Sequence, residues 1–209
     1  GIIITEYSAA NCDGDGNDCG DYEDWIELYN NTSLAIDLSG YYLSDKVDNI
    51  MKWQIPYSLS VEPYSHLIIY ASGLDSELEV SATNTNFKLT QTKGTEFIIL
   101  SNPEGLIQDY VKLTPHQLNH SVGRNTDYEW RFYAQPTPGS ENDPAIPYLD
   151  YVTTPTYSLE SGFYTNSIQL LIDCSHPDVE IYYTVDGSLP DENSIYYGYT
   201  DSAGVLFSE

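Results

Sequence analysis

Apolar and β-branched residues occur along this chain in short runs, most of which alternate with polar residues. The runs are IIITEYS, WIELYN, HLIIYAS, TEFIILS, LIQDYVKL, SIQLLID and VEIYYTV, and turn signals such as NPEG and DG separate them. Helical periodicity is almost absent. Many short strands separated by turn residues are typical of antiparallel sandwiches and barrels. The pattern therefore predicts an all-β protein.

A stretch dense in proline and polar residues, AQPTPGSENDPAIPYLDYVTTP at residues 134–155, separates two groups of these runs. A chain of 209 residues is long enough to bury two cores. We therefore expect a first domain over residues 1–143, a Pro-rich linker over 144–154 and a second domain over 155–209. The chain starts at Gly1 without an initiator methionine, so we expect a fragment of a larger protein from which any export signal has been removed.

The charge balance excludes one class of partner. The chain carries 32 acidic and 7 basic residues, a formal net charge of −25. A nucleic-acid binder needs clustered Lys and Arg, and the field of this chain would repel a polyanion. No apolar run approaches the roughly 18 residues that a membrane helix needs. We expect neither nucleic-acid binding nor a membrane-spanning segment.

The segment AANCDGDGNDCGDYEDWIELYN at residues 9–30 is the strongest candidate for a metal site. Its oxygen-bearing side chains fall at positions one, three, five, nine and twelve of an EF-hand-like register: Asp13, Asp15, Asn17, Asp21 and Asp24. Calcium prefers such ligands, but position six is Asp18 where Gly is usual, and position twelve is an Asp rather than Glu. The loop predicts either a calcium site or a solvated acidic turn.

The three cysteines suggest one disulfide and one buried thiol. Cys12 and Cys19 enclose a small loop, and a bridge between them would fit an exported protein. A zinc site would need more Cys or His nearby. Cys174 continues the alternation of Ile168, Leu170 and Ile172, so we expect it to point into the second core.

Catalytic signals are weak. No G-x-S-x-G motif occurs, and acidic residues are plentiful without any reason to select two of them. His116 and His120 are four residues apart, so one helical turn could bring them to a shared metal, the alternative being polar loop positions. His66 is expected at the surface or a strand edge. Arg124 and Arg131 are expected to bond carboxylates or carbonyls.

Aromatic residues offer a possible binding surface. Trp25 and Trp130 lie inside strand patterns and are expected in or beside the core. In the second domain the tyrosines alternate imperfectly, so some must face outward. Aromatic faces bind carbohydrate and cations. The candidate ligand surface consists of Tyr182, Tyr196 and Tyr197.

Seven motifs in the first domain occur in the order typical of one family: IIITEYSA, DWIELYN, IDLSGYYLSD, FKLTQTKGTEFIIL, NPEGLIQDYV, SVGRNTDYEWRF and PTPGSEN. Residues 1–143 thereby resemble the lamin-tail domain family, which implies an immunoglobulin-like β-sandwich. In nuclear lamins this domain binds protein partners and DNA. We do not carry the DNA binding over, because the chain lacks a basic surface.

The second domain resembles the C-terminal domain of chitobiases and β-hexosaminidases, another immunoglobulin-like fold. The resemblance rests on PTYSLESGFYTNSIQLLIDCSHPDVEIYYTVDGSLPDENSIYYG, with IYYTVDGSLP as its core signature. Asp186 and Gly187 can take the positive φ of a hairpin turn. That family usually continues with another strand, so we expect the second sandwich to be truncated, with an incomplete edge strand.

Together the two resemblances imply a non-catalytic interaction, adhesion or spacer module of a secreted or cell-surface, bacterial multidomain protein. Its partner would be a protein or a glycan at a cell surface. Two alternatives stay open. The first is a carbohydrate-targeting accessory module of a secreted hydrolase, and the second is a metal-dependent hydrolase that uses the acidic loop.

Overall fold

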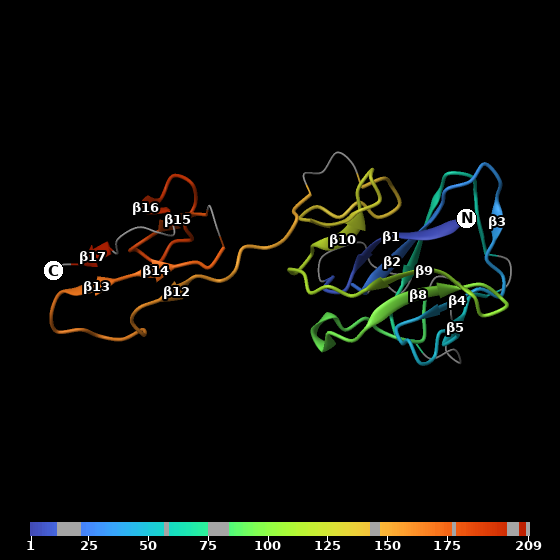
Figure 1. The fold of residues 1–209 in the computed structure, drawn as a ribbon, viewed down its shortest axis with the longest axis horizontal. Helices are drawn as coiled ribbons and strands as arrows, with labels where there is room; N and C mark the ends of the chain where they lie inside the picture. Colours follow the sequence, from blue (N-terminus) through green and yellow to red (C-terminus); the bar gives the residue numbers. More distant parts are fainter. Residues whose placement is uncertain are drawn as a thin grey trace. The chain divides into compact units, whose positions relative to one another are not determined.

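The fold is seen in a computed structural model, which describes residues 1–11, 22–56, 59–74, 84–142, 147–176, 179–199 and 205–207. The chain divides into two compact units, Gly1–Leu149 and Asp150–Glu209 (Figure 1). The predicted domain and linker bounds stay predictions. Within the described ranges, no helix combines the length and the hydropathy needed to cross a membrane.

The described residues of the first unit form two antiparallel sheets and one short strand pair. The five-stranded sheet has the order β11-β10-β1-β2-β7, with β1 (Ile2–Ser8), β2 (Trp25–Asn30), β7 (His66–Tyr70), β10 (Ser121–Arg124) and β11 (Trp130–Tyr133). The four-stranded sheet has the order β5-β4-β8-β9, with β4 (Tyr42–Ser44), β5 (Trp53–Gln54), β8 (Phe97–Ser101) and β9 (Ile107–Lys112). The pair is β3 (Ile36–Asp37) with β6 (Ser60–Val61), and η1 (Gln91–Lys93) is a single 3-10 turn.

Period-two alternation explains the core of this unit. Ile26 and Leu28 of β2 are fully buried and alternate with Trp25, Glu27 and Tyr29, because successive side chains of a strand point to opposite faces. Buried aliphatic residues of both sheets supply the core: Ile4, Ile26, Leu28, Leu43, Ile69, Ile98 and Leu100. Burying each such side chain stabilises the fold by about 1.5 to 3 kcal/mol. The predicted all-β, immunoglobulin-like sandwich is confirmed.

An ion pair ties the two sheets together. Arg124 of β10 lies 3.0 and 3.1 Å from the two carboxylate oxygens of Asp109 in β9, and its Nε donates to the Ile4 carbonyl of β1 at 2.9 Å. The Asp109 carboxylate also accepts the Ile4 backbone N–H at 2.9 Å. The Arg124 guanidinium lies 4.6 Å from the Trp130 ring centre. The prediction that Arg124 bonds carboxylates and carbonyls is confirmed.

The second unit contains three two-stranded antiparallel pairs. They are β12 (Thr156–Tyr157) with β14 (Ile172–Asp173), β13 (Ile168–Leu170) with β17 (Val205–Phe207), and β15 (Glu180–Tyr183) with β16 (Ile195–Tyr199). Ile172, Cys174 and Ile181 form a small buried cluster. The Cys174 thiol donates to the Thr153 carbonyl at 3.3 Å. The expected burial of Cys174 in the second core is confirmed.

Candidate functional site

Two glutamates face each other on the outer side of the five-stranded sheet. The register of β1 and β2 pairs Ile4 with Leu28, shifts at Thr5, and then pairs Glu6 with Glu27. This β-bulge places one extra residue in β1. Both glutamates are fully buried, although like charges directly opposite each other in a sheet are destabilising. The pair therefore needs compensating donors.

Donors reach both carboxylates of this pair. Glu6 Oε1 accepts the Ser121 hydroxyl and, at 3.3 Å, the Thr137 backbone N–H, while Oε2 lies 3.3 Å from the Thr137 hydroxyl, which shares its single proton with Asn142. Glu27 Oε1 accepts the Thr5 hydroxyl at 2.6 Å, and Oε2 accepts the Gly139 N–H at 2.7 Å. Two of these donor residues belong to the closing segment, which we define as residues 137–142 (TPGSEN). The glutamate pair thus anchors this segment to the sheet.

The environment shifts the titration of Glu6. Burial raises the pKa of Glu6 to about 7, and the negative charge of Glu27 acts in the same direction. The hydrogen bonds from Ser121 and Thr137 oppose this shift because they stabilise the ionised form. Glu6 therefore titrates near neutral pH.

Asn142 fastens the end of the closing segment. Its side-chain amide donates to the Thr5 carbonyl at 3.0 Å and to the Arg124 carbonyl at 3.1 Å, and its side-chain oxygen accepts the Thr137 hydroxyl at 2.8 Å. A Cβ at Gly123 would lie 2.3 Å from the Asn142 amide nitrogen. Only glycine leaves room there, so the SVGR and TPGSEN motifs form one physical unit.

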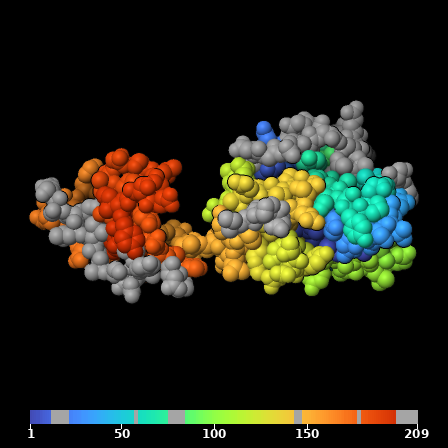
Figure 2. Space-filling view, turned by 90° about the horizontal axis from the view of Figure 1, so that it is seen from above, coloured from blue at the N-terminus to red at the C-terminus, as the bar shows by residue number. Residues whose placement is uncertain are grey.

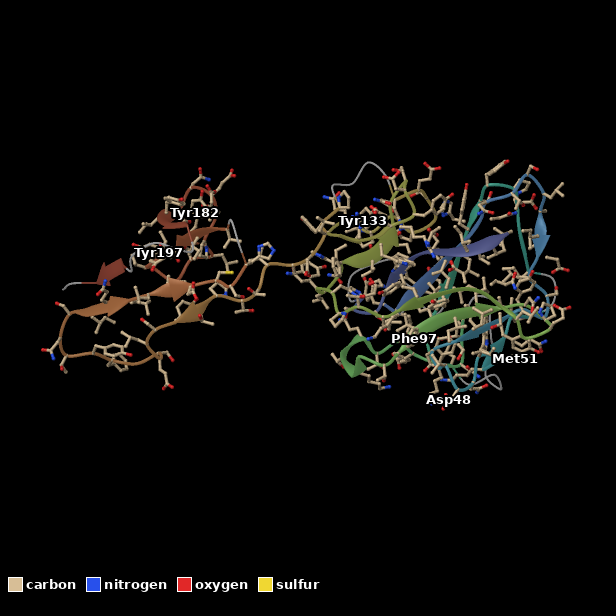
Figure 3. The ribbon with its side chains drawn as sticks, viewed as in Figure 1. Asp48, Met51, Phe97, Tyr133, Tyr182 and Tyr197 are labelled. Atoms are coloured by element: carbon tan, nitrogen blue, oxygen red, sulfur yellow. The ribbon has the colours of Figure 1, made fainter. Side chains whose placement is uncertain are left out.

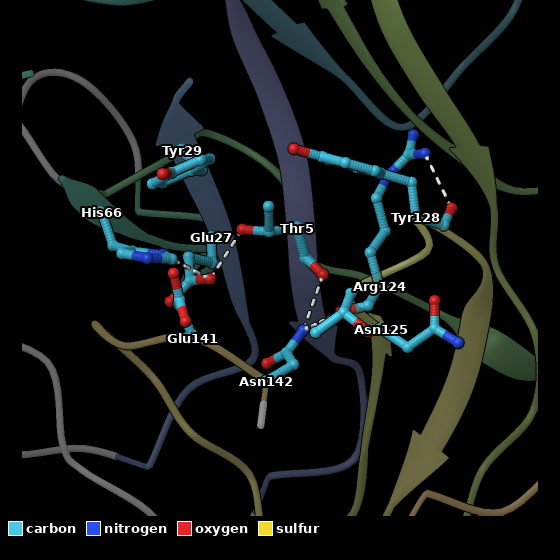
Figure 4. Close-up of a pocket in the computed structure, with 10 residues that line it drawn as sticks. Thr5, Glu27, Tyr29, His66, Arg124, Asn125, Tyr128, Glu141 and Asn142 are labelled. Atoms are coloured by element: carbon cyan, nitrogen blue, oxygen red, sulfur yellow. Dashed lines mark hydrogen bonds and ion pairs between the residues drawn. The ribbon is translucent and has the colours of Figure 1, made fainter. Parts of the chain in front are cut away.

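A partly enclosed cavity of about 190 Å³ lies beside this unit (Figure 4). Its lining residues come from β1, β2, β7, β10 and the loops that follow: Thr5, Glu27, Tyr29, His66, Arg124, Asn125, Thr126, Tyr128, Glu141 and Asn142. Figure 2 shows residues near 125–142 (yellow) packed beside the chain around β7 (cyan), two segments far apart in the sequence. The fold alone brings these residues together.

Three aromatic residues line the cavity. The rings of Tyr29 and His66 lie 4.6 Å apart between centres, and Figure 4 shows them near Glu27, with Tyr128 beyond Thr5. His66 Nδ1 is 2.9 Å from Glu27 Oε1 but lies off the direction that a hydrogen bond requires, so it has no hydrogen-bond partner. Tyr128 has a φ of 62°, which is rare for a bulky residue, and its side chain is 53% exposed.

Comparison with known proteins identifies the first unit. A family model described as Lamin Tail Domain matches residues 1–115, more than half of the 209 residues. The chain belongs to the lamin tail domain family. The structure adds β10, β11 and the closing segment, which lie beyond the matched residues but complete the same sheet and site.

A second family model, described as Chitobiase/beta-hexosaminidase C-terminal domain, matches residues 159–204. The predicted arrangement of a lamin tail domain followed by a chitobiase-like domain is confirmed. No curated protein and no solved structure matches the chain. Both matched domains are immunoglobulin-like accessory domains rather than catalytic ones.

Most of the predicted calcium loop of the lamin tail domain lies outside the described residues. This applies to the metal-ligand candidates Asp13, Asp15, Asn17 and Asp21 and to the predicted Cys12–Cys19 disulfide. Asp24 is described: its carboxylate accepts the Asn11 backbone N–H at 3.3 Å, and burial raises its pKa to about 6. No group of three metal-ligating side chains occurs among the residues that the structure describes. Calcium and the disulfide stay predictions.

His116 has a structural role in the lamin tail domain. Residues 113–117 form no helical turn, so the turn that could have brought His116 and His120 to a shared metal is not formed, and the alternative of loop positions holds. His116 is buried, its Nδ1 donates to the Thr114 carbonyl at 3.0 Å, and its Nε2 accepts the Ala9 N–H at 3.0 Å. Burial lowers the pKa of His116. Both ring nitrogens are therefore used within the fold.

The three candidate tyrosines of the second unit have different environments. Tyr182 and Tyr196 pair across β15 and β16, with ring centres 5.4 Å apart and planes tilted by 53°. Tyr196 is 48% exposed. Tyr197 instead packs against the buried cluster, and its hydroxyl accepts the Ile172 N–H at 3.1 Å (Figure 3). Only Tyr182 and Tyr196 lie together at the surface.

The sequence reasoning did not single out Glu6, Glu27, Tyr128 or Glu141. The two glutamates occupy polar positions of alternating strands, where solvent exposure is the ordinary expectation. The TPG-x-x-N motif was the available signal, since a motif rich in turn residues after the last strand is where a chain can fold back over the sheet. His66 does lie on an edge strand, as expected, but beside a buried carboxylate.

Proposed function

We propose that this chain is a non-catalytic interaction module of an exported or cell-surface protein, which provides adhesion, spacing or targeting for the polypeptide that carries it. The single observation behind this proposal is the use made of the Glu6 and Glu27 pair. Paired buried carboxylates are the most enzyme-like feature of the described residues. Here donors from within the fold bind both carboxylates, and the pair fastens the closing segment to the sheet.

The matched families support the same proposal. Both are accessory domains, and an acidic chain with a formal net charge of −25 suits an extracellular surface exposed to cations and salt.

The carbohydrate-targeting alternative has less support. A flat sugar-stacking platform requires coplanar rings, whereas the Tyr182 and Tyr196 planes are tilted by 53°. The alternative of a metal-dependent hydrolase is supported by the acidic loop alone. Neither alternative gains a specific observation from the described residues.

The test combines a binding assay with a turnover assay. The labelled 209-residue chain is incubated with intact bacterial cells, before and after protease treatment of the cells, and with insoluble chitin and cellulose. We expect retention on cells that protease treatment abolishes. Failure to bind any cell surface would contradict the adhesion role, and retention on polysaccharide would favour the targeting module. Turnover of phosphodiester, phosphomonoester or glycoside substrates with calcium or zinc would contradict a non-catalytic module if Asp13→Ala with Asp15→Ala abolished it.

A further inference from the structure

The closing segment lines the cavity beside the glutamate pair without filling it, so the cavity can hold a ligand. The structure points to a receptor site for a basic side chain, lysine or arginine, of a partner protein, formed by Glu141, Tyr29 and Tyr128 above the buried Glu27. This inference rests on the proposed interaction role and names the chemistry of the partner.

Volume is the first argument. About 190 Å³ is many times the 10 to 15 Å³ that one water molecule needs by the same measure. The site therefore has room for an extended aliphatic stem with a charged end, rather than for one bound ion.

Charge is the second argument. Glu27 and Glu141 bring two carboxylates to the lining, and Glu27 is fully buried, so its charge acts through a poorly screening environment. Arg124 is the lining residue with a permanent positive charge, and both carboxylate oxygens of Asp109 already hold its guanidinium. The negative charges of Glu27 and Glu141 therefore attract a cation to the cavity.

The aromatic walls are the third argument. Rings of tyrosine attract ammonium and guanidinium groups within about 6 Å of the ring centre, and more strongly when the cation is desolvated. Both Tyr29 and Tyr128 line the cavity, and Figure 4 shows Tyr29 next to Glu27 and Tyr128 beyond Thr5. Tyr29 and Glu141 both line the cavity. Burial raises the pKa of Tyr29, and the negative charge of Glu141 acts in the same direction.

His66 lines the cavity beside Glu27. Its side chain is only 10% exposed, and its Nδ1 lies 2.9 Å from Glu27 Oε1 without making a hydrogen bond. A bound group, or the water that it carries, can donate to or accept from this nitrogen.

The test uses the full chain and short peptides. Ac-Gly-Lys-Gly-NH₂ and Ac-Gly-Arg-Gly-NH₂ are titrated at low salt and followed by NMR, with the Nζ-acetylated lysine peptide as the neutral control. We expect the cationic peptides to shift resonances of Tyr29, His66 and Tyr128, and 0.5 M NaCl to weaken binding because the attraction is electrostatic. Equal binding of the acetylated peptide, no shift at these residues, or displacement by an equal concentration of calcium would overturn the assignment.

Variants locate the site. Glu141→Gln and Tyr128→Asn should each weaken peptide affinity about two- to fivefold, and Asn tolerates the positive φ at residue 128. Glu104→Gln and Tyr110→Asn are matched changes at exposed residues outside the cavity and should leave affinity unchanged. If these controls weaken binding as much as the cavity variants, the site lies elsewhere. Retention on cells without peptide binding would preserve the proposed function and refute this inference alone.

Discussion

Glu6 and Glu27 lie directly opposite each other on strands β1 and β2, and both are fully buried. Two carboxylates in this position would repel each other in an uncapped sheet. The bulge at Thr5 and the donors of the closing segment make the pairing tolerable. Through the closing segment, the pair affects the pH dependence of folding stability, the need for glycine at residue 123 and the lining of the neighbouring cavity.

The first prediction concerns pH. The unfolded Glu6 releases its proton near 4.5 and the folded one near 7, so between these values the native state binds more protons. Stability therefore falls as pH rises through this window, by up to about 3 kcal/mol. Glu6→Gln should raise the melting temperature at pH 8 by several degrees and change little at pH 4.

The difference between Glu6→Gln and the parent chain isolates this effect. Asp24, whose pKa is also raised, and His116, whose pKa is lowered, act in opposite directions, but both are present in the two proteins. The exposed Glu104→Gln is the matched control and should follow the parent curve. Parallel melting curves of parent and Glu6→Gln from pH 4 to pH 8 would rule out a shifted Glu6.

The second prediction concerns Gly123. Its Cβ position lies 2.3 Å from the Asn142 amide, so Gly123→Ala must displace Asn142 and break its bonds to Thr5 and Arg124. We expect a loss of about 2 to 4 kcal/mol in the free energy of unfolding. Urea unfolding followed by tryptophan fluorescence measures it, because all three tryptophans lie in the first unit.

Gly1→Ala is the control for that experiment, since Gly1 belongs to the unit that contains the tryptophans and nothing lies within 4 Å of a Cβ there. It should change stability by less than about 0.5 kcal/mol. A Gly123→Ala protein as stable as the control would mean that Asn142 does not hold the closing segment.

The third prediction concerns the inter-sheet ion pair. Arg124→Lys keeps the charge but cannot reach Asp109, the Ile4 carbonyl and the Tyr128 carbonyl together. We expect a loss of about 1 to 3 kcal/mol in the same unfolding assay. Arg131→Lys, whose partner Glu129 is largely exposed, should cost less than about 0.5 kcal/mol. A loss for Arg124→Lys as small as that for Arg131→Lys would show that Arg124 acts through its charge alone.

Local sequence patterns predicted the fold well and the site poorly. The alternation of Ile26 and Leu28 with polar neighbours depends only on residues next to each other in one strand, and so does the burial of Cys174. The site instead joins β1, β2, β7 and the closing segment, over separations such as that between Thr5 and Asn142. A one-residue bulge determines which side chains face each other, and the hydrophobic periodicity of the sequence does not predict where it occurs. Tyr128 reaches the cavity through a positive φ that is unusual for its residue type.

The fourth prediction concerns the thiols. If Cys12 and Cys19 form a disulfide, then Cys174 is the one cysteine of the three that reacts with a thiol reagent in denaturant without reductant. Mass spectrometry of the digested, unreduced chain should recover the two loop peptides as a linked pair. Reaction of all three thiols before reduction would refute the disulfide.

The fifth prediction concerns calcium and the acidic loop. If Asp13, Asp15, Asn17, Asp21 and Asp24 bind calcium, the ion relieves repulsion between carboxylates and stabilises the folded state. At about 100 times its dissociation constant it would add about 2.7 kcal/mol, so the chain should melt several degrees higher in calcium than in chelator. Asp13→Ala with Asp15→Ala should remove that difference.

The matched control removes the same number of charges elsewhere in the first unit. Asp48 and Asp127 are exposed, and Asp48→Ala with Asp127→Ala should leave the calcium effect intact, because a bound ion depends on its ligands and not on total charge. Coincident melting curves of the parent chain in calcium and in chelator would leave a solvated acidic turn. That result would also remove the metal on which the hydrolase alternative depends.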